Sequence, residues 1–220
     1  RGDGEENEFF GRQVIIEGDM VFVSSRTFSD SDDVEYLYSV HVFEKLDSDW
    51  TKVAKIPVGH SSYSNLPIAY SNGVLAVGAP DYLEGKVYLY DKNESGDWGL
   101  SETLVPARND EPFYMFGYSL DMHEDQIIVG APGNNAQNPR ASEVVIFGKE
   151  DGGWSQFQVV SSGADIVDGF GLHVGIHSNH MVVGSPLSDE PFENAGKITL
   201  FSNREGVWEE TSVINSPYPA

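Results

Sequence analysis

The sequence predicts an all-β fold in which one antiparallel unit of four strands occurs four times. The tryptophans give the first evidence, because Trp50, Trp98, Trp154 and Trp208 lie 48, 56 and 54 residues apart. Seven or eight positions before each tryptophan, an aromatic residue closes an alternating run such as Val144-Val145-Ile146-Phe147. Such alternation is typical of a β-strand between two environments. The 23 glycines and the many tyrosine, phenylalanine, valine and isoleucine residues also favour strands joined by frequent turns.

A second motif marks the first half of each unit. Phe116-Gly117 precedes Val129-Gly130-Ala131-Pro132, and Phe170-Gly171 precedes a similar segment, with fifteen residues from glycine to proline in both. The first unit has Arg26 at the proline position, and the second has Asn65 at the glycine position. Turn-forming pairs within each unit indicate tight hairpins. The predicted units cover residues 7–56, 63–104, 113–160 and 168–214.

Repeated four-stranded units of about 50 residues predict a β-propeller. One such sheet has two apolar faces, and packing sheets face to face around an axis covers both. The tryptophans are expected to fill the gaps between these sheets, which are called blades. Residues 1–220 therefore form one propeller domain or a propeller segment. The four blades could close as a compact ring, belong to a larger ring, or be completed by a second chain, and the larger ring is slightly favoured.

These units resemble FG-GAP repeats, the blades of the integrin α-subunit propeller. On their Phe-Gly, Val-Gly-Ala-Pro and tryptophan marks, they are closest to the variant found in bacterial and algal surface proteins. The resemblance implies a ring of seven blades and a role in cell adhesion or another extracellular protein–protein interaction. Integrin blades carry a calcium cage between the two motifs. The corresponding segments here are tight turns, so no calcium site is carried over from the family.

Composition excludes several classes of function. The 35 acidic residues outnumber the 13 lysines and arginines, which gives a net charge of −22. Such a chain is not expected to bind nucleic acid or an anionic membrane surface. Cysteine is absent, which excludes disulfides, thiol chemistry and cysteine-based zinc sites. No apolar run is long enough to span a membrane, so no membrane insertion by this segment is expected.

The connections that vary in length predict a binding face. In an antiparallel unit of strands A to D, the B–C loops and the linkers to the next unit emerge at the same end. These two classes of connection vary in length here, whereas the A–B and C–D turns hardly do. Variable loops on a rigid scaffold commonly bind partners. Acidic and aromatic residues of this face form the candidate site: Tyr36, Tyr82, Phe113, Tyr114, Asp189, Glu190 and Phe192.

Two groups of residues could hold a metal ion. The first B–C loop has alternate carboxylates that could converge on calcium: Asp30, Asp32, Asp33 and Glu35. The loop has no glycine for the sharp turn of a calcium loop, so a solvated acidic loop is favoured and no cofactor is expected. His173, His177 and His180 suggest zinc, but a hairpin supplies too few ligands from them. Asn93 begins an Asn-Glu-Ser sequon in a C–D turn and is a candidate for glycosylation.

The functional prediction is a non-catalytic module at a cell surface or in an extracellular assembly, which binds a protein partner through the loop face. The alternative is a carbohydrate-binding propeller in which exposed aromatics stack on sugar rings. A hydrolase with paired carboxylates is the third reading. It is disfavoured because no Gly-x-Ser-x-Gly, phosphate-binding or His-Glu-x-x-His motif occurs. The chain is therefore expected not to be an enzyme.

Overall fold

The computed structural model describes residues 8–28, 36–61, 66–81, 85–107, 115–133, 142–163, 168–189 and 192–217. The side chains of residues 28, 36, 60 and 61 also lie outside what it describes. Within the described residues the secondary structure consists of sixteen β-strands. No described helix is long and apolar enough to cross a membrane.

Four sheets are formed, each from four consecutive strands. The first sheet contains β1 (Val14–Glu17), β2 (Met20–Phe28), β3 (Tyr36–Leu46) and β4 (Asp49–Ser61). The second contains β5 (Ile68–Ser71), β6 (Val74–Ala79), β7 (Lys86–Lys92) and β8 (Trp98–Leu104). The third contains β9 (Ser119–His123), β10 (Gln126–Ala131), β11 (Glu143–Glu150) and β12 (Gly153–Ser161). The fourth contains β13 (His173–His177), β14 (His180–Ser185), β15 (Lys197–Arg204) and β16 (Val207–Asn215).

Every neighbouring pair of strands within a sheet is antiparallel, in the order in which the strands occur along the chain. The predicted tight turns join the first two strands of each sheet. Asn72 and Ser178 occupy two of these turns with φ values of 48° and 53°, a conformation that asparagine and serine adopt more readily than branched residues. The predicted all-β fold of four antiparallel four-stranded units is therefore confirmed.

A β-bulge occurs at the same place in all four sheets, between the third and fourth strands. The register shifts immediately before the aromatic residue that closes each alternating run: Phe43, Tyr90, Phe147 and Phe201. A bulge leaves one residue of the fourth strand unpaired and increases the local twist. Its recurrence shows that the repeats share backbone geometry as well as sequence.

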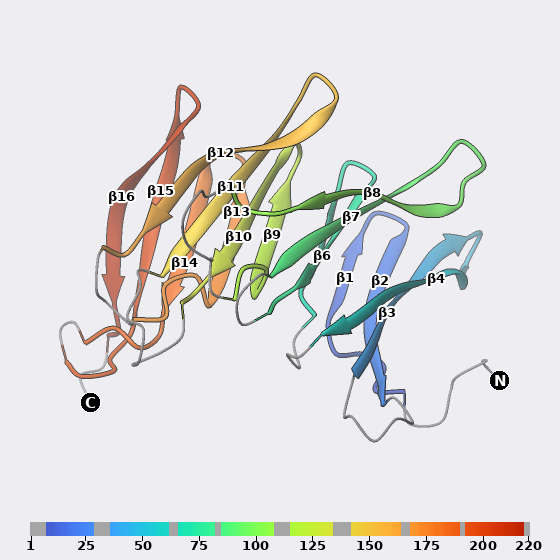
Figure 1. Ribbon diagram of the computed structural model, residues 1–220, viewed down its shortest axis with the longest axis horizontal. Coiled ribbons are helices and arrows are strands. Elements are labelled where there is room, and N and C mark those ends of the chain that lie inside the picture. Colours follow the sequence, from blue (N-terminus) through green and yellow to red (C-terminus); the bar gives the residue numbers. More distant parts are fainter. Residues whose placement is uncertain are drawn as a thin grey trace.

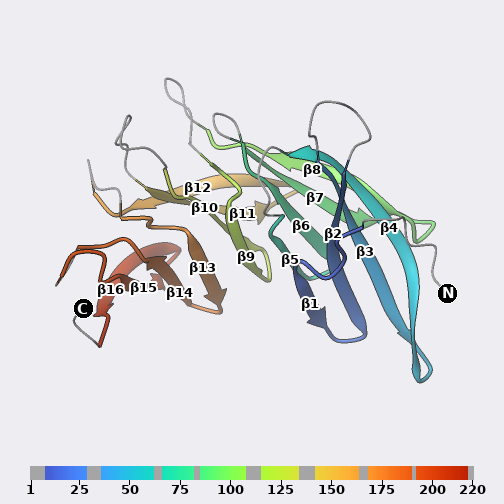
Figure 2. The same ribbon diagram turned by 90° about the horizontal axis from the view of Figure 1, so that it is seen from below.

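The four sheets stack face to face in an open arc (Figures 1 and 2). The first strands β1, β5, β9 and β13 lie side by side along the inner, concave side of the arc, and β4, β8 and β12 lie toward the outside. Three apolar cores fill the spaces between successive sheets. The first and fourth sheets lie at opposite ends (Figure 2), so the four blades do not close on one another as a compact ring.

The phenylalanine of each Phe-Gly motif defines two faces of its sheet. Phe116 packs edge-on against Phe147, and Phe170 packs edge-on against Phe201, with ring centroids 6.1 and 6.3 Å apart. We call the face that carries this phenylalanine the leading face, and the opposite face the trailing face. The leading face of the third sheet packs on the second sheet, and that of the fourth packs on the third.

Glycines allow successive sheets to approach closely. A Cβ added at Gly78 or Gly130 would collide with the carbonyl oxygen of Gly117 or Gly171, respectively. The Phe-Gly glycines Gly117 and Gly171 therefore lie on the glycines of the preceding sheets' Val-Gly-Ala-Pro segments, where no side chain fits. The two sequence motifs are thus two halves of one contact between blades.

The tryptophans fill inter-blade spaces in three sheets but not in the first. Trp208 is buried to 2% exposure between the third and fourth sheets, and Trp98 and Trp154 are partly buried in the other two cores. Trp50 is 44% exposed, so the prediction that all four tryptophans fill such spaces is wrong for this residue. The physical reason is that the leading face of the first sheet has no sheet packed on it.

Candidate functional site

The connections with variable length lie at one end of the sheets. In Figure 1 the tight turns, such as those between β11 and β12 and between β15 and β16, point upward. The strand ends that border the B–C loops and the linkers lie at the opposite end, below. The antiparallel order of every sheet requires this separation, because consecutive connections alternate between the two ends.

Two of the predicted binding residues lie within the described part of this face. Phe192 is 46% exposed, although phenylalanine buries a large apolar surface when it packs inside a protein. Asp189 is exposed, and its Oδ1 accepts a hydrogen bond from the backbone N–H of Asn194 at 2.9 Å. This carboxylate therefore shapes the loop that presents Phe192. The other members lie outside the described residues, or only their side chain does: Tyr36, Tyr82, Phe113, Tyr114 and Glu190.

Asn93 lies in the turn between β7 and β8, at the end of the sheets opposite the candidate binding face. Its side chain is exposed, and its Oδ1 accepts hydrogen bonds from the backbone N–H groups of Ser95 and Asp97, both at 2.9 Å. This pattern is an Asx-type turn and explains why asparagine occurs here. Access to a modifying enzyme would be open, because the turn projects from the sheet.

The candidate calcium loop with Asp30, Asp32, Asp33 and Glu35 lies outside the described residues. Over the described part of the chain, no group of three or more histidine or acidic side chains is arranged to hold a metal ion. His177 and His180 pair across a tight turn, as the sequence suggested. The ring of His177 packs on that of His123 from the neighbouring sheet, with centroids 4.6 Å apart.

A partly buried carboxylate connects the third and fourth sheets beside this histidine pair. Asp121 Oδ2 accepts the backbone N–H of Ile176 at 2.8 Å, and Oδ1 accepts that of Met122. Burial raises the pKa of the Asp121 carboxyl, and the two N–H donors and the nearby His123 and His177 only partly offset this effect. The contact joins two blades through a backbone hydrogen bond, so we assign it a structural role.

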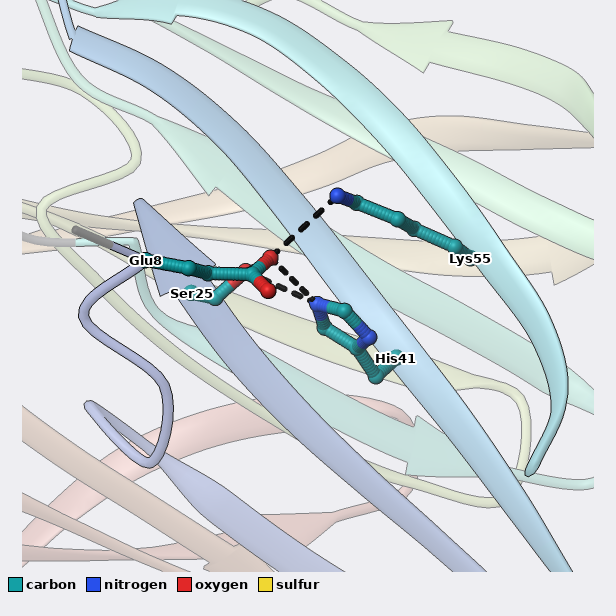
Figure 3. A network of polar contacts seen from close by, with 4 residues as sticks. All are labelled: Glu8, Ser25, His41 and Lys55. Carbon is teal, nitrogen blue, oxygen red and sulfur yellow. Dashed lines mark hydrogen bonds and ion pairs between the residues drawn. The ribbon is translucent and has the colours of Figure 1, made fainter. Parts of the chain in front are cut away.

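A cluster of polar side chains that the sequence did not reveal lies on the leading face of the first sheet (Figure 3). Glu8 precedes β1, and Ser25, His41 and Lys55 lie on β2, β3 and β4. Glu8 Oε1 accepts a hydrogen bond from Ser25 Oγ at 2.9 Å and lies 2.8 Å from His41 Nε2 and 3.3 Å from Lys55 Nζ. The Glu8 side chain is 7% exposed, and Ser25 and His41 are buried.

The geometry of this cluster determines what it can do. Burial raises the pKa of the Glu8 carboxyl, but hydrogen bonds from Ser25, His41 and Lys55 outweigh burial and hold it below its usual value. Ser25 Oγ also lies 3.0 Å from His41 Nε2, so the serine and the carboxylate contact the same ring nitrogen. A serine–histidine–acid relay needs them on opposite nitrogens. The cluster therefore anchors the segment before β1 and does not form a nucleophile.

Glu8, Ser25, His41 and Lys55 are dispersed over 48 positions, so no spacing motif could have identified the cluster. The one available signal was His41, a polar residue within the alternating run Val40-His41-Val42-Phe43. Val145 holds the equivalent place in the third sheet, two residues before the aromatic that closes the run. A histidine at an expected core position indicates a buried polar partner.

No protein-family model matches this chain, and no curated protein sequence matches it. Solved structures do. The β-propeller domain of the Trilobed protease from Pyrococcus furiosus, described as having an open velcro topology, is 10% identical, with a TM-score of 0.53. The alignment covers 94% of this chain and 57% of that one. The acylaminoacyl peptidase of Pyrococcus horikoshii is 9% identical, with a TM-score of 0.57, over 95% of this chain and 32% of the peptidase chain. These similarities establish the β-propeller fold.

Proposed function

We propose that this propeller is a non-catalytic interaction module that binds a protein partner through the end of the sheets that carries the B–C loops and the linkers. The observation that carries the proposal is the position of Phe192, a large apolar side chain left 46% exposed on a loop held by Asp189. Exposed aromatic residues are enriched at the centres of protein interfaces. The rigid sheets below would hold such a residue in a fixed position.

We also propose that the four blades are FG-GAP repeats, and that the module acts outside the cell or at its surface. The support is the contact of the Phe-Gly glycines Gly117 and Gly171 with the glycines of the preceding Val-Gly-Ala-Pro segments, which gives both motifs a structural role. The net charge of −22 disfavours nucleic acid as the partner and favours a protein with a basic surface. The peptidase propellers share the fold, but their sequence identity of 9–10% to this chain supports no inference about activity.

Photo-crosslinking tests which end of the sheets binds. A photoreactive residue is placed at position 192 in one variant and at position 95, in the turn between β7 and β8, in the other. Both variants are incubated with a cell-surface protein extract and irradiated. We expect a discrete crosslinked species from position 192 that Asp189→Asn weakens, and none from position 95. Equal labelling from both positions would refute binding through the loop end.

A carbohydrate-binding propeller is the second candidate, because the exposed ring of Phe192 could also stack on a sugar. A glycan array separates the two. Specific sugar binding that Phe192→Ala abolishes, while Leu100→Ala on the outer strand β8 preserves it, would replace the protein partner by a glycan. Turnover of glycosides or esters in an activity screen would overturn the non-catalytic assignment.

A further inference from the structure

The trailing face of the fourth sheet carries an apolar pocket of about 400 Å³ at the end of β14 and β15. Its lining includes Gly184 and Pro186 of the Val-Gly-Ser-Pro segment, together with Ile198 and Ile214. Gly184 and Pro186 are motif positions, so the same place can be examined in the second and third sheets, which carry Gly78 and Gly130. The comparison shows what normally fills it.

The paired aliphatic residues at this place are covered wherever another sheet follows. Gly78, Gly130 and Gly184 each pair with the next strand, at Val87, Val144 and Ile198, respectively. Val87 and Val144 are fully buried, whereas Ile198 is 38% exposed and its partner Ile214 is 51% exposed. In the third sheet the covering element is the Phe-Gly turn of the fourth, because Phe170 belongs to the core that contains Val144.

The space around each glycine shows more directly whether another sheet covers this place. At Gly78 and Gly130 an added Cβ would collide with the Phe-Gly turn of the following sheet. At Gly184 an added Cβ would meet only the Cβ and carbonyl oxygen of His173, both at an ordinary 3.6 Å. His173 pairs with Gly184 as Ser119 pairs with Gly130, and the Ser119 hydroxyl donates a hydrogen bond to Gly171 at 2.7 Å. The fourth sheet thus keeps the features that hold the Phe-Gly turn on the third sheet: the glycine, the apolar wall and, at His173, a polar side chain in the place of Ser119.

The matching half of the contact lies at the other end of the arc. Phe10 packs edge-on against Phe43, with ring centroids 6.1 Å apart, as Phe116 and Phe170 pack in their sheets. Phe116 and Phe170 are at most 2% exposed, but Phe10 is 52% exposed, and a Cβ added at Gly11 would meet nothing within 4 Å. Around it on the leading face, Val14, Ile16 and Trp50 are also exposed.

We propose that two copies of this chain associate head to tail, with the Phe10-Gly11 turn of each copy seated in the Gly184 pocket of the other. The contact of a Phe-Gly turn with the preceding sheet, present at Gly117 and at Gly171 within the chain, continues across this interface. A head-to-tail interface closes into a ring when the rotation between copies permits, and the open arc in Figure 2 leaves both of its end faces available. This inference goes beyond the proposed loop-face function and does not depend on it.

Gly184→Ala is the decisive variant, because the added methyl group fits within its own chain and blocks only the docked turn. Sedimentation of the wild-type chain from about 1 µM to about 1 mM should show a rise from 24.2 kDa toward twice that mass. Gly184→Ala should keep the wild-type melting temperature and weaken association by about tenfold or more. Phe10→Ala should weaken association similarly, whereas Leu100→Ala, a comparably exposed residue on β8, should not.

Mixing the variants tests the head-to-tail arrangement. Gly184→Ala retains an intact Phe10 turn and Phe10→Ala retains an intact pocket, so the mixture should associate more strongly than either variant alone. Added salt should strengthen association, because each copy carries a charge of −22 and screening weakens their repulsion. A wild-type chain that sediments at 24.2 kDa at every concentration would overturn the proposal. So would association that Gly184→Ala and Phe10→Ala leave unchanged.

Discussion

The phenylalanine of the Phe-Gly motif should contribute very different amounts to the free energy of unfolding in different blades. Phe170 is 2% exposed between the third and fourth sheets, whereas Phe10 is 52% exposed on the leading face of the first. Both rings pack edge-on against the aromatic residue of their own sheet, Phe201 and Phe43. Replacing each by alanine therefore removes the same chemistry from two environments that differ mainly in the presence of a neighbouring sheet.

The expected magnitudes follow from burial. Phe170→Ala should destabilise the chain by about 3–5 kcal/mol, because the truncated side chain leaves a cavity that the two sheets cannot refill. Burying a phenylalanine completely contributes about 1.5–3 kcal/mol, and Phe10 buries about half of its surface, so Phe10→Ala should cost about 1 kcal/mol. Water fills the space at Phe10, so no cavity cost is added there.

Thermal and urea unfolding at a dilute protein concentration, below that at which copies associate, measures both variants. At about 2–4 °C per kcal/mol for a chain of this size, Phe170→Ala should lower the melting temperature by about 10 °C and Phe10→Ala by only a few degrees. Phe116→Ala is the matched control and should resemble Phe170→Ala, since Phe116 is also fully buried. Equal losses for Phe170→Ala and Phe10→Ala would refute the claim that the covering sheet creates the difference.

Three further predictions concern tryptophan packing, metal and pH. Trp208→Ala should lower the free energy of unfolding in urea by about 3–5 kcal/mol, whereas Trp50→Ala, at 44% exposure, should lower it by about 1 kcal/mol. Similar losses for the two variants would show that Trp208 does not fill an inter-blade space. EDTA should leave the melting temperature unchanged, because no calcium cage is expected in any blade; a loss of many degrees would implicate residues 30–35. The Glu8 pKa is lowered in the folded chain, so its contribution to stability is complete above the ordinary value of about 4.5 and is lost as the pH falls through the lowered value. Glu8→Gln should therefore weaken the dependence of the melting temperature on acid pH, whereas Glu94→Gln, in an exposed turn, should leave it unchanged. An unchanged pH profile for Glu8→Gln would contradict the contacts in Figure 3.

The sequence was sufficient to predict the strands, the hairpins and the repeat. These features depend on local chemistry: alternation such as Val144 to Phe147 gives a strand with two faces, and turn residues such as Asn72-Gly73 give a tight reversal. The fixed spacing between Phe-Gly and Gly-Ala-Pro also predicted a common unit. Its meaning, a contact between glycines of successive blades, required the packed sheets.

The candidate binding site was predicted only in part. The end of the sheets at which variable loops emerge follows from antiparallel order, and Phe192 and Asp189 lie there. The cluster of Glu8, Ser25 and His41 could not be predicted, because it joins residues that are distant in sequence and share no motif spacing. Long-range polar contacts of this kind are created by strand pairing and by the path of the segment before β1.

The sequence by itself determined which side chains occupy each face of each strand, because side chains alternate along an extended backbone. Tertiary structure alone decided which of those faces is covered. Phe10 and Phe170 have the same motif and the same edge-on partner, yet one is half exposed and the other is buried. Ile198 and Val144 hold equivalent register positions, yet Ile198 is exposed and Val144 is buried. Burial depends on the sheet packed against the strand, and no local pattern in the strand records whether that sheet is present.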